Sequence, residues 1–145
     1  MERYPMQIQS ITGWQEHILA GREYVKTASR GVSRPAVFNK ELIFQLAAMG
    51  IEKTLAGLCQ YHHQMPCDHT LSGMVGELTD VCIVEPDLVE RIQRIERVDD
   101  ICSLTPRRRI PPNDAEIREV LAVGEAVVRF ARQTVPEYNQ PSTAA

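Results

Sequence analysis

The 145-residue sequence lacks an excess of basic residues, a long apolar run and a glycine-rich loop. Its 16 lysines and arginines are outnumbered by 19 aspartates and glutamates, so the formal net charge is −3. Sequence-independent binding to nucleic acid relies on a basic excess. The charge therefore argues against a protein that binds DNA or RNA over its whole surface, although it remains compatible with a local basic patch.

The lack of a long apolar run indicates where in the cell the protein is expected. A membrane span requires roughly 18 or more consecutive apolar residues, and no segment reaches that length. The first ten residues, MERYPMQIQS, also lack the basic-then-apolar order of a signal peptide. We therefore expect a cytoplasmic protein with no membrane partner. In that compartment we expect reduced thiols rather than disulfides at the four cysteines, Cys59, Cys67, Cys82 and Cys102.

Patterns typical of several enzyme classes are missing as well. The sequence has no Gly-x-Ser-x-Gly elbow for serine hydrolysis and no glycine-rich loop to hold a nucleotide phosphate. Its acidic residues fall mainly on the outward stripes of the expected helices, which argues against a paired-carboxylate hydrolase. From these patterns we expect no cofactor and no catalytic residue.

The sequence does contain one long apolar helix over residues 38–59, FNKELIFQLAAMGIEKTLAGLC. At 100° per residue, its apolar side chains cover well over half of the circumference, so the helix must be surrounded by partners. Gly50 and Gly57 lie on the apolar side, where the missing Cβ allows a neighbouring backbone to approach closely. The apolar positions are Leu42, Ile43, Leu46, Ala47, Met49, Gly50, Ile51, Leu55 and Leu58.

We expect one all-α domain over residues 12–134, an antiparallel up-and-down bundle of four to five helices. Short loops separate the amphipathic segments, and the sequence shows no internal repeat and no convincing strand alternation. Residues 1–11 are expected to form an N-terminal extension and residues 135–145 a flexible tail. The helices are expected at about 12–29, 37–61, 70–84, 86–98 and 113–134.

Capping patterns mark several of these helix ends. Thr12 with Gln15, and Asn113 with Glu116, have the three-residue spacing of a capping box. Pro86 suits the first position of a helix, where the N–H that proline lacks is not needed. The expected apolar stripe of the first helix consists of Trp14, Ile18, Gly21, Val25 and Ala28.

Four stretches of the sequence resemble the HEPN domain (higher eukaryotes and prokaryotes nucleotide-binding domain), a family of helical bundles. They are ELIFQLA at 41–47, GIEKTL at 50–55, DHTL at 68–71 and AVGEAVVRF at 122–130. The resemblance covers roughly residues 12–134. It implies a helical bundle that tends to pair with a second copy of itself, and it divides into two functional branches.

In one branch, family members are similar to metal-independent ribonucleases of toxin–antitoxin systems, where an arginine, four to six residues and then a histidine supply the catalytic pair. This sequence departs from that pattern, because no histidine has an arginine five to seven positions before it and none follows residue 69. Members of the other branch lack the pair and bind nucleotides or a partner nucleotidyltransferase. The histidines here are His17, His62, His63 and His69.

Residues that can ligate a metal gather at the end of the central helix. Thiolates and imidazoles are the ligands that Zn²⁺ selects. No Cys-x2-Cys pair is present, however, and His62 and His63 point away from each other on a helix end. We therefore expect a solvated helix terminus and loop, with no metal. The cluster consists of Cys59, His62, His63, Cys67, Asp68 and His69.

A basic run lies in the proline-bounded loop before the last helix. Arginine side chains there can hold a phosphate through bidentate hydrogen bonds, or they can remain a solvated charge run that neighbouring aspartates neutralise. Arg94 is a further cation nearby, on the expected fourth helix. The run consists of Arg107, Arg108 and Arg109.

Two more candidate binding residues lie near the central helix. Lys53 falls within the apolar arc, so it either extends to the rim or pairs with a residue of another helix. His69 matches a position of the HEPN pattern, in the loop after the central helix. Its neighbours Asp68 and Thr70 are both suited to cap the next helix, which favours a structural role for the histidine.

The sequence thus favours a non-catalytic HEPN-like helical module that binds a protein partner, such as a nucleotidyltransferase, or a nucleotide. The alternative from a different class is a divergent HEPN ribonuclease toxin that acts on RNA. A third reading is an oligomeric helical scaffold with no enzymatic role. The apolar breadth of the central helix favours a homodimer, because four neighbouring helices barely cover so wide an arc.

Overall fold

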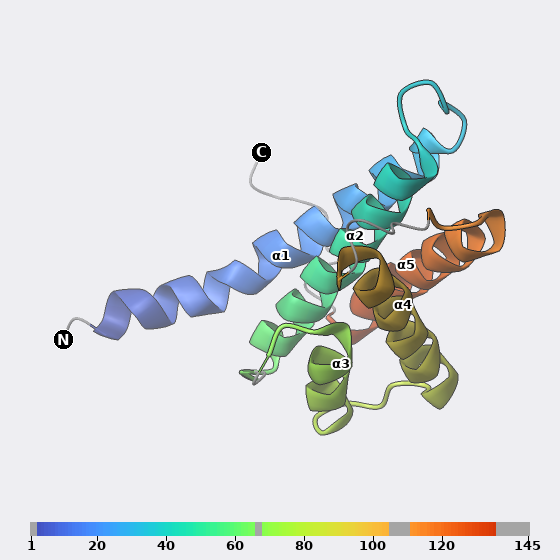
Figure 1. Cartoon of the computed structure of the whole chain (residues 1–145). Helices are drawn as coiled ribbons and strands as arrows, with labels where there is room; N and C mark the ends of the chain where they lie inside the picture. The colour runs from blue at the N-terminus through green and yellow to red at the C-terminus, as the bar shows by residue number, and fades with distance from the viewer. Residues whose placement is uncertain (1–2, 66–67, 105–110, 136–145) are drawn as a thin grey trace.

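The computed structural model describes the backbone of residues 3–65, 68–104 and 111–135, and within them the side chains of residues 13–65, 68–98 and 111–135. These residues form helices joined by loops and contain no strand, so the predicted all-α fold class is confirmed (Figure 1). The helices are α1 (Arg3–Gly31), α2 (Lys40–Tyr61), α3 (Leu71–Thr79), α4 (Pro86–Leu104) and α5 (Asp114–Thr134).

α1 and α2 run side by side in opposite directions and form the most extensive helix pair (Figure 1). A Cβ atom added to Gly50 would lie 2.5 Å from Val25 Cγ2 and 2.8 Å from the carbonyl oxygen of Gly21. One added to Gly57 would lie 2.7 Å from Ile18 Cγ1. Because no side chain fits at these distances, the glycines determine how closely the two backbones approach. The close approach predicted from Gly50 and Gly57 is confirmed.

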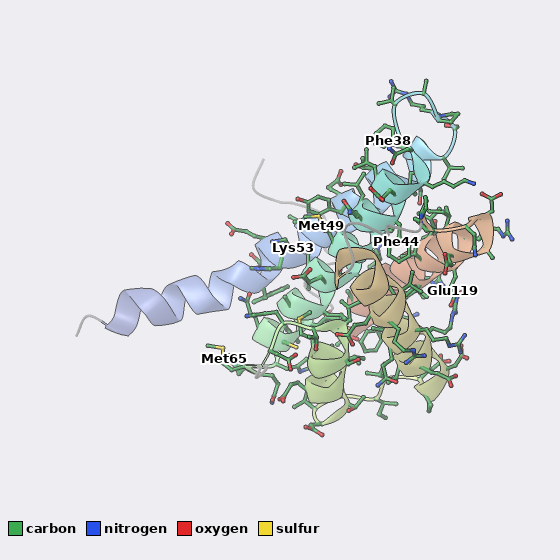
Figure 2. All side chains as sticks on the ribbon, in the orientation of Figure 1. Phe38, Phe44, Met49, Lys53, Met65 and Glu119 are labelled. Carbon is green, nitrogen blue, oxygen red and sulfur yellow. The ribbon has the colours of Figure 1, made fainter. Side chains whose placement is uncertain are left out.

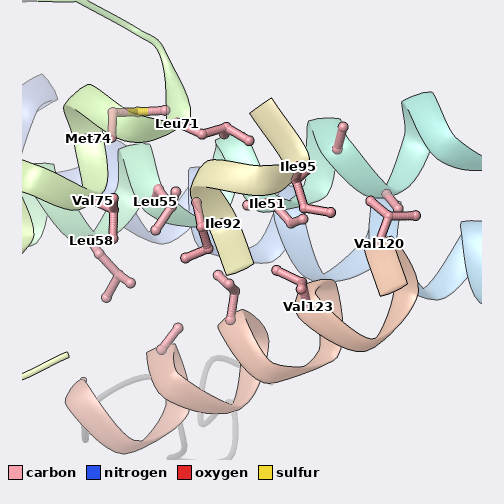
Figure 3. Packing of buried hydrophobic residues seen from close by; sticks show 14 of the residues in the cluster. Ile51, Leu55, Leu58, Leu71, Met74, Val75, Ile92, Ile95, Val120 and Val123 are labelled. Carbon is pink, nitrogen blue, oxygen red and sulfur yellow. The ribbon is translucent and has the colours of Figure 1, made fainter. Parts of the chain in front are cut away.

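The core lies where α2 meets α3, α4 and α5 (Figure 3). In this cluster Ile51 and Leu55 of α2 are buried together with Ile92 of α4, and Val123 of α5 is wholly buried in the same cluster. The predicted stripe of α1 is also buried throughout. The largest fully buried side chains are Phe44, Ile18, Ile51, Leu55, Leu58, Met74, Leu78, Ile92, Val75, Val120, Val123 and Val127.

Part of the apolar arc of α2 is left outside this core. Leu42 and Met49 are 38% and 39% exposed, and Leu46 is half-buried. Figure 2 shows Met49 and Lys53 on one side of α2 and Phe44 on the other. The core helices therefore cover one side of α2, and an apolar strip of the same helix reaches the surface.

Side-chain caps begin three of the helices. Asn39 accepts a hydrogen bond from the Leu42 N–H at 2.8 Å at the start of α2, and Thr70 accepts one from the Gly73 N–H at 3.0 Å at the start of α3. Before α5, Asn113 forms the complete capping box that its spacing to the residue three positions on predicts. α4 begins at Pro86, as predicted.

The capping box predicted at Thr12 is wrong, because α1 begins at Arg3 and continues through this residue. Most of the expected N-terminal extension is thus helical, and the first turns of α1 extend beyond the other helices (Figure 1). Pro5 is compatible with this start, since proline is tolerated in the first turn of a helix. The capping pattern at Thr12 and Gln15 therefore does not mark a helix start, because no proline near these residues interrupts α1.

Two further helix ends differ from the expected ones. α3 ends at Thr79 rather than at residue 84, and N–H groups of the next residues bond back to Glu77 and Leu78 to close its last turn. The segment that follows, 81–84, is mostly β-branched and has a low helix propensity. α4 continues to Leu104 rather than 98, because the first breaker is the proline at 106.

The C-terminal end also differs from the expected one. Val135, assigned to the flexible tail, is wholly buried in the core. Residues 136–145 lie outside the described part of the chain. Within the described residues, α2 is the one helix long and apolar enough to cross a membrane, and 61% of its most apolar window is buried inside the bundle.

The contact between α1 and α2 can be tested with two glycine substitutions. Gly57→Ala should lower the free energy of unfolding by roughly 1–3 kcal/mol, because the added Cβ would lie 2.9 Å from the carbonyl oxygen of Trp14. Gly76→Ala in α3 is the matched control, since a Cβ there has nothing within 4 Å. It should raise stability by up to about 1 kcal/mol. Urea denaturation measures both, and an equal effect of the two substitutions would contradict the close crossing.

Candidate functional site

The predicted binding residues do not form one site. Lys53 is half-buried on the exposed side of α2, and no ion pair is recorded for it within the described residues (Figure 2). Arg94 lies on α4 and pairs with Glu90 at 3.0 Å, one helical turn away. His69 lies in the loop between α2 and α3. The basic run Arg107, Arg108 and Arg109 falls outside the described residues.

His69 lies at the edge of a pocket between α2, α3 and the middle of α4, with a volume of about 340 Å³. The described residues that line it include two carboxylates, Glu52 and Glu96, and no lysine or arginine. Glu96 accepts hydrogen bonds from the hydroxyl and the backbone N–H of Ser72, which fixes it against α3. The lining residues are Gln45, Ala48, Met49, Glu52, His69, Thr70, Leu71 and Glu96.

The charge of this pocket determines what it can bind. Among the described lining residues the two carboxylates have no lysine or arginine to offset their charge, so these residues are poorly suited to hold a phosphate ester. His69 is exposed beside Asp68, whose pKa is lowered by the hydroxyl and N–H of Thr70 and then by the charge of His69. Asp68 thereby supports Thr70, the residue that caps α3. Of the two candidate caps, Thr70 is therefore the N-cap of α3, and Asp68 accepts hydrogen bonds from Thr70 instead of capping the helix itself.

The cluster of cysteines and histidines at the end of α2 is described only in part, because Cys67 lies outside the described residues. The Cys59 thiol is buried and lies 3.6 Å from the carbonyl oxygen of Met74. Burial, then the charges of Glu77 and Cys82, raise the pKa of Cys59 to about 11, so the thiol stays protonated at neutral pH. The pKa of His62 is lowered by burial and by His63. In the part of the chain that the structure describes, no three such residues are placed to hold a metal ion.

An apolar surface runs along α1 and α2, and we call it the α1–α2 face. On α2 its residues recur at alternating spacings of four and three, and so do those of α1. A shallow groove of about 310 Å³ follows the junction of the two helices around Leu46, with Glu23 at its edge. The face consists of Leu42, Leu46, Met49, Lys53 and Ala56 on α2 and of His17, Ala20, Tyr24 and Thr27 on α1.

A second surface, the α1–α5 groove, was missed by the sequence reasoning. It has a volume of about 370 Å³ and lies between α1 and α5. The only signal in the sequence is the spacing of its basic residues, four apart on α1 and three apart on α5, and the sequence does not show that these helices are neighbours. The groove is lined by Arg22, Val25, Lys26, Ser29, Glu125, Val128, Arg129 and Arg132.

An ion pair joins α4 to α5. Arg91 donates from Nε to one carboxylate oxygen of Glu119 at 2.8 Å and from a terminal nitrogen to the other at 3.1 Å. This bidentate hydrogen bonding lowers the pKa of Glu119 below its usual range and raises that of Arg91. Asp87 lies 3.9 Å from the same guanidinium group. The pair has a clear structural role and does not line any of the surfaces above.

No protein-family model, no curated protein and no solved structure matches this chain. Its function must therefore be argued from the chemistry of its own surfaces. Of these, the α1–α2 face exposes apolar side chains, the α1–α5 groove is lined by basic side chains together with Glu125, and the described lining of the pocket beside His69 includes two carboxylates.

The ion pair between α4 and α5 should stabilise the fold in a pH-dependent way. Glu119→Gln should lower the free energy of unfolding by roughly 1 kcal/mol near neutral pH, since the pair is partly exposed. The folded-state pKa of Glu119 lies below its usual value of 4.5, so the stabilisation is complete above that pH and is lost as the pH falls through the lowered pKa.

Urea denaturation of the parent protein and of Glu119→Gln over this pH range tests the prediction, and the two free energies should converge in acid. Glu90→Gln is the matched control, because it removes an exposed pair within one helix and should cost only about 0.3–0.5 kcal/mol. A difference between parent and Glu119→Gln that stays constant with pH would contradict the proposed role of the ion pair.

Proposed function

We propose that this chain is a non-catalytic helical module that acts by binding protein, and that its first partner is a second copy of itself. The observation that carries the proposal is the α1–α2 face, where Leu42 and Met49 remain more than a third exposed beside the half-buried Leu46. Apolar residues exposed in a continuous row, rather than singly, mark an interaction surface.

The spacing of the row favours a helical partner. Residues that alternate by four and three positions remain on one side of a helix over several turns, which is the pattern of helices that pack side by side in bundles. On α1 the residues at this spacing include the polar His17 and Thr27, so the apolar part of the surface lies mainly on α2. A second copy rotated by a two-fold axis would present the same two rows, and the four helices would pack as a small bundle.

The charges on the face are self-complementary. Lys53 lies in the α2 row, and Glu23 lies at the edge of the groove on α1. Because a two-fold axis repeats every contact, a pair between these residues across the interface would form twice. Lys53 then serves as a pairing residue between copies, which accounts for a cation in an otherwise apolar row.

The resemblance to HEPN domains supports the same proposal. It implies a helical bundle that pairs, and the chain lacks the arginine-then-histidine pattern of the ribonuclease branch. A partner nucleotidyltransferase, which the resemblance also implies, would then bind a preformed dimer. The ribonuclease alternative is disfavoured by the pocket at His69, because Glu52 and Glu96 oppose the approach of a phosphodiester.

Self-association can be tested by charge reversal. The parent protein should sediment at about twice its chain mass of 16.4 kDa. Met49→Asp and Lys53→Glu should each raise the dissociation constant by about tenfold or more, because the first places a carboxylate in the apolar row and the second opposes Glu23. The double variant Lys53→Glu with Glu23→Lys should restore the dimer.

Lys26→Glu is the matched control for this test. It makes the same charge change on the other flank of α1 and should leave the dimer intact. Circular dichroism of each variant confirms that the fold is retained. A parent protein that sediments as a monomer at micromolar concentration, or a Lys26→Glu variant that dissociates as readily as Lys53→Glu, would refute the proposed interface.

The absence of catalysis gives a separate prediction. Purified protein should not cleave a mixed RNA pool in the presence of a metal chelator, since general acid–base assistance contributes about 10²- to 10⁴-fold in rate and the described lining of the pocket at His69 holds no lysine or arginine. Expression of the chain alone should leave growth unaffected. Metal-free cleavage that disappears in a folded His69→Ala variant would replace this proposal with the ribonuclease.

A further inference from the structure

The pocket beside His69 combines apolar walls with polar groups. Ala48 and Leu71, which line it, are buried, and Met49 is 39% exposed. A methionine side chain is flexible and polarizable, so it adapts to the shape of a bound group. The volume of about 340 Å³ is near the lower end of the range of roughly 300–1,000 Å³ for ligand sites, which suits a single side chain better than an extended ligand.

One carboxylate of the pocket is held in a fixed position. Ser72 of α3 donates its hydroxyl and its backbone N–H to the same carboxylate oxygen of Glu96, the N–H at 3.3 Å. The other oxygen of Glu96 accepts no hydrogen bond from a described residue. Because the side chain is half-buried and anchored to α3, this second oxygen can accept from a ligand with little further loss of side-chain freedom.

The second carboxylate has no bound partner of its own. Glu52 is exposed on α2, and no ion pair or hydrogen bond joins its side chain to another described residue. Lys53 follows it in the sequence but is not among the described residues that line the pocket. Gln45, also on α2, adds a side-chain carbonyl oxygen. The described lining therefore offers hydrogen-bond acceptors from both α2 and α4, with no lysine or arginine to satisfy them.

An arginine side chain matches this arrangement. Its planar guanidinium group presents several N–H donors in a rigid fork and no acceptor, so it can donate to oxygens on two helices at once. It is also more weakly hydrated than an ammonium group, so it loses less on entering a pocket with buried apolar walls. Its aliphatic stem can pack on those walls while the charged head reaches the carboxylates. A lysine is a compact point charge and reaches fewer of these acceptors.

We propose that the pocket beside His69 binds an arginine side chain presented by a partner protein. The inference rests on the proposed function in one respect, that the chain acts by binding protein, and it does not depend on the dimer. Met49 lines both the pocket and the α1–α2 face, so the pocket adjoins the surface along which protein is proposed to bind. The pocket then selects among partners, because a segment without a basic residue leaves both carboxylates unpaired.

NMR titration of the full chain with N-acetyl-arginine amide tests the site. This capped arginine should shift the backbone amide signals of Glu52, Thr70 and Leu71 saturably, with a dissociation constant on the order of 1 mM for one isolated side chain. Capped citrulline has nearly the shape of capped arginine but no charge, and it should bind about tenfold more weakly or less. Capped lysine should also bind more weakly than capped arginine.

Two substitutions locate the probe in the pocket. Glu96→Gln should raise the dissociation constant of capped arginine by about tenfold, and Glu52→Gln by about threefold, because the second carboxylate is more exposed to solvent. Glutamine keeps an oxygen that can accept from Ser72, so the fold should be retained, which circular dichroism checks. Glu16→Gln is the matched control, since it removes an exposed carboxylate of α1 outside the pocket and should leave the affinity unchanged.

The inference is overturned if capped arginine causes no saturable shift, if capped citrulline or capped lysine binds as tightly, or if the folded Glu96→Gln variant binds as the parent does. Tighter binding of free arginine than of the capped form would replace it with a site for the amino acid. Ca²⁺ that shifts the same signals at a lower concentration would replace it with a metal site. Both glutamine variants should sediment like the parent, and a monomeric parent that still binds capped arginine would refute the dimer alone.

Discussion

The close approach of α1 and α2 is the constraint on which the rest of the structure depends. Glycines at 21, 50 and 57 remove the side chains that would hold the two backbones apart. One side of α2 is thereby committed to α1, and only the opposite side remains for α3, α4 and α5. Neither contact covers the strip of α2 that lies between them. This strip is therefore exposed, and it carries Leu42 and Met49.

The same constraint gives α1 two different flanks. One flank continues the exposed apolar strip of α2 and forms the α1–α2 face. The other flank meets α5 where Val25 packs against Gly124, and its charged residues line the α1–α5 groove. An apolar surface favours association with protein, whereas clustered cations favour anions. The two flanks of α1 thus differ in chemistry and share no side chain.

The pocket beside His69 shows how neighbouring residues determine the chemistry of a histidine. An imidazole is an effective acid or base towards a phosphodiester when a cation stabilises the negative charge that develops. The charged residues that line this pocket with His69 are Glu52 and Glu96, and Glu96 accepts hydrogen bonds from Ser72. Burial raises the pKa of the Cys59 thiol to about 11, so this thiol stays protonated at neutral pH.

The sequence by itself determined the helices, the central place of α2, the cap at Asn113 and the close approach at the glycines, because these features depend on local periodicity and on the absence of a Cβ. It did not determine the true start of α1, the end of α3 or the α1–α5 groove. Helix ends depend on packing as much as on propensity, and residues from the two ends of the chain meet only in the folded bundle. Which cations lie together was therefore decided by tertiary structure alone.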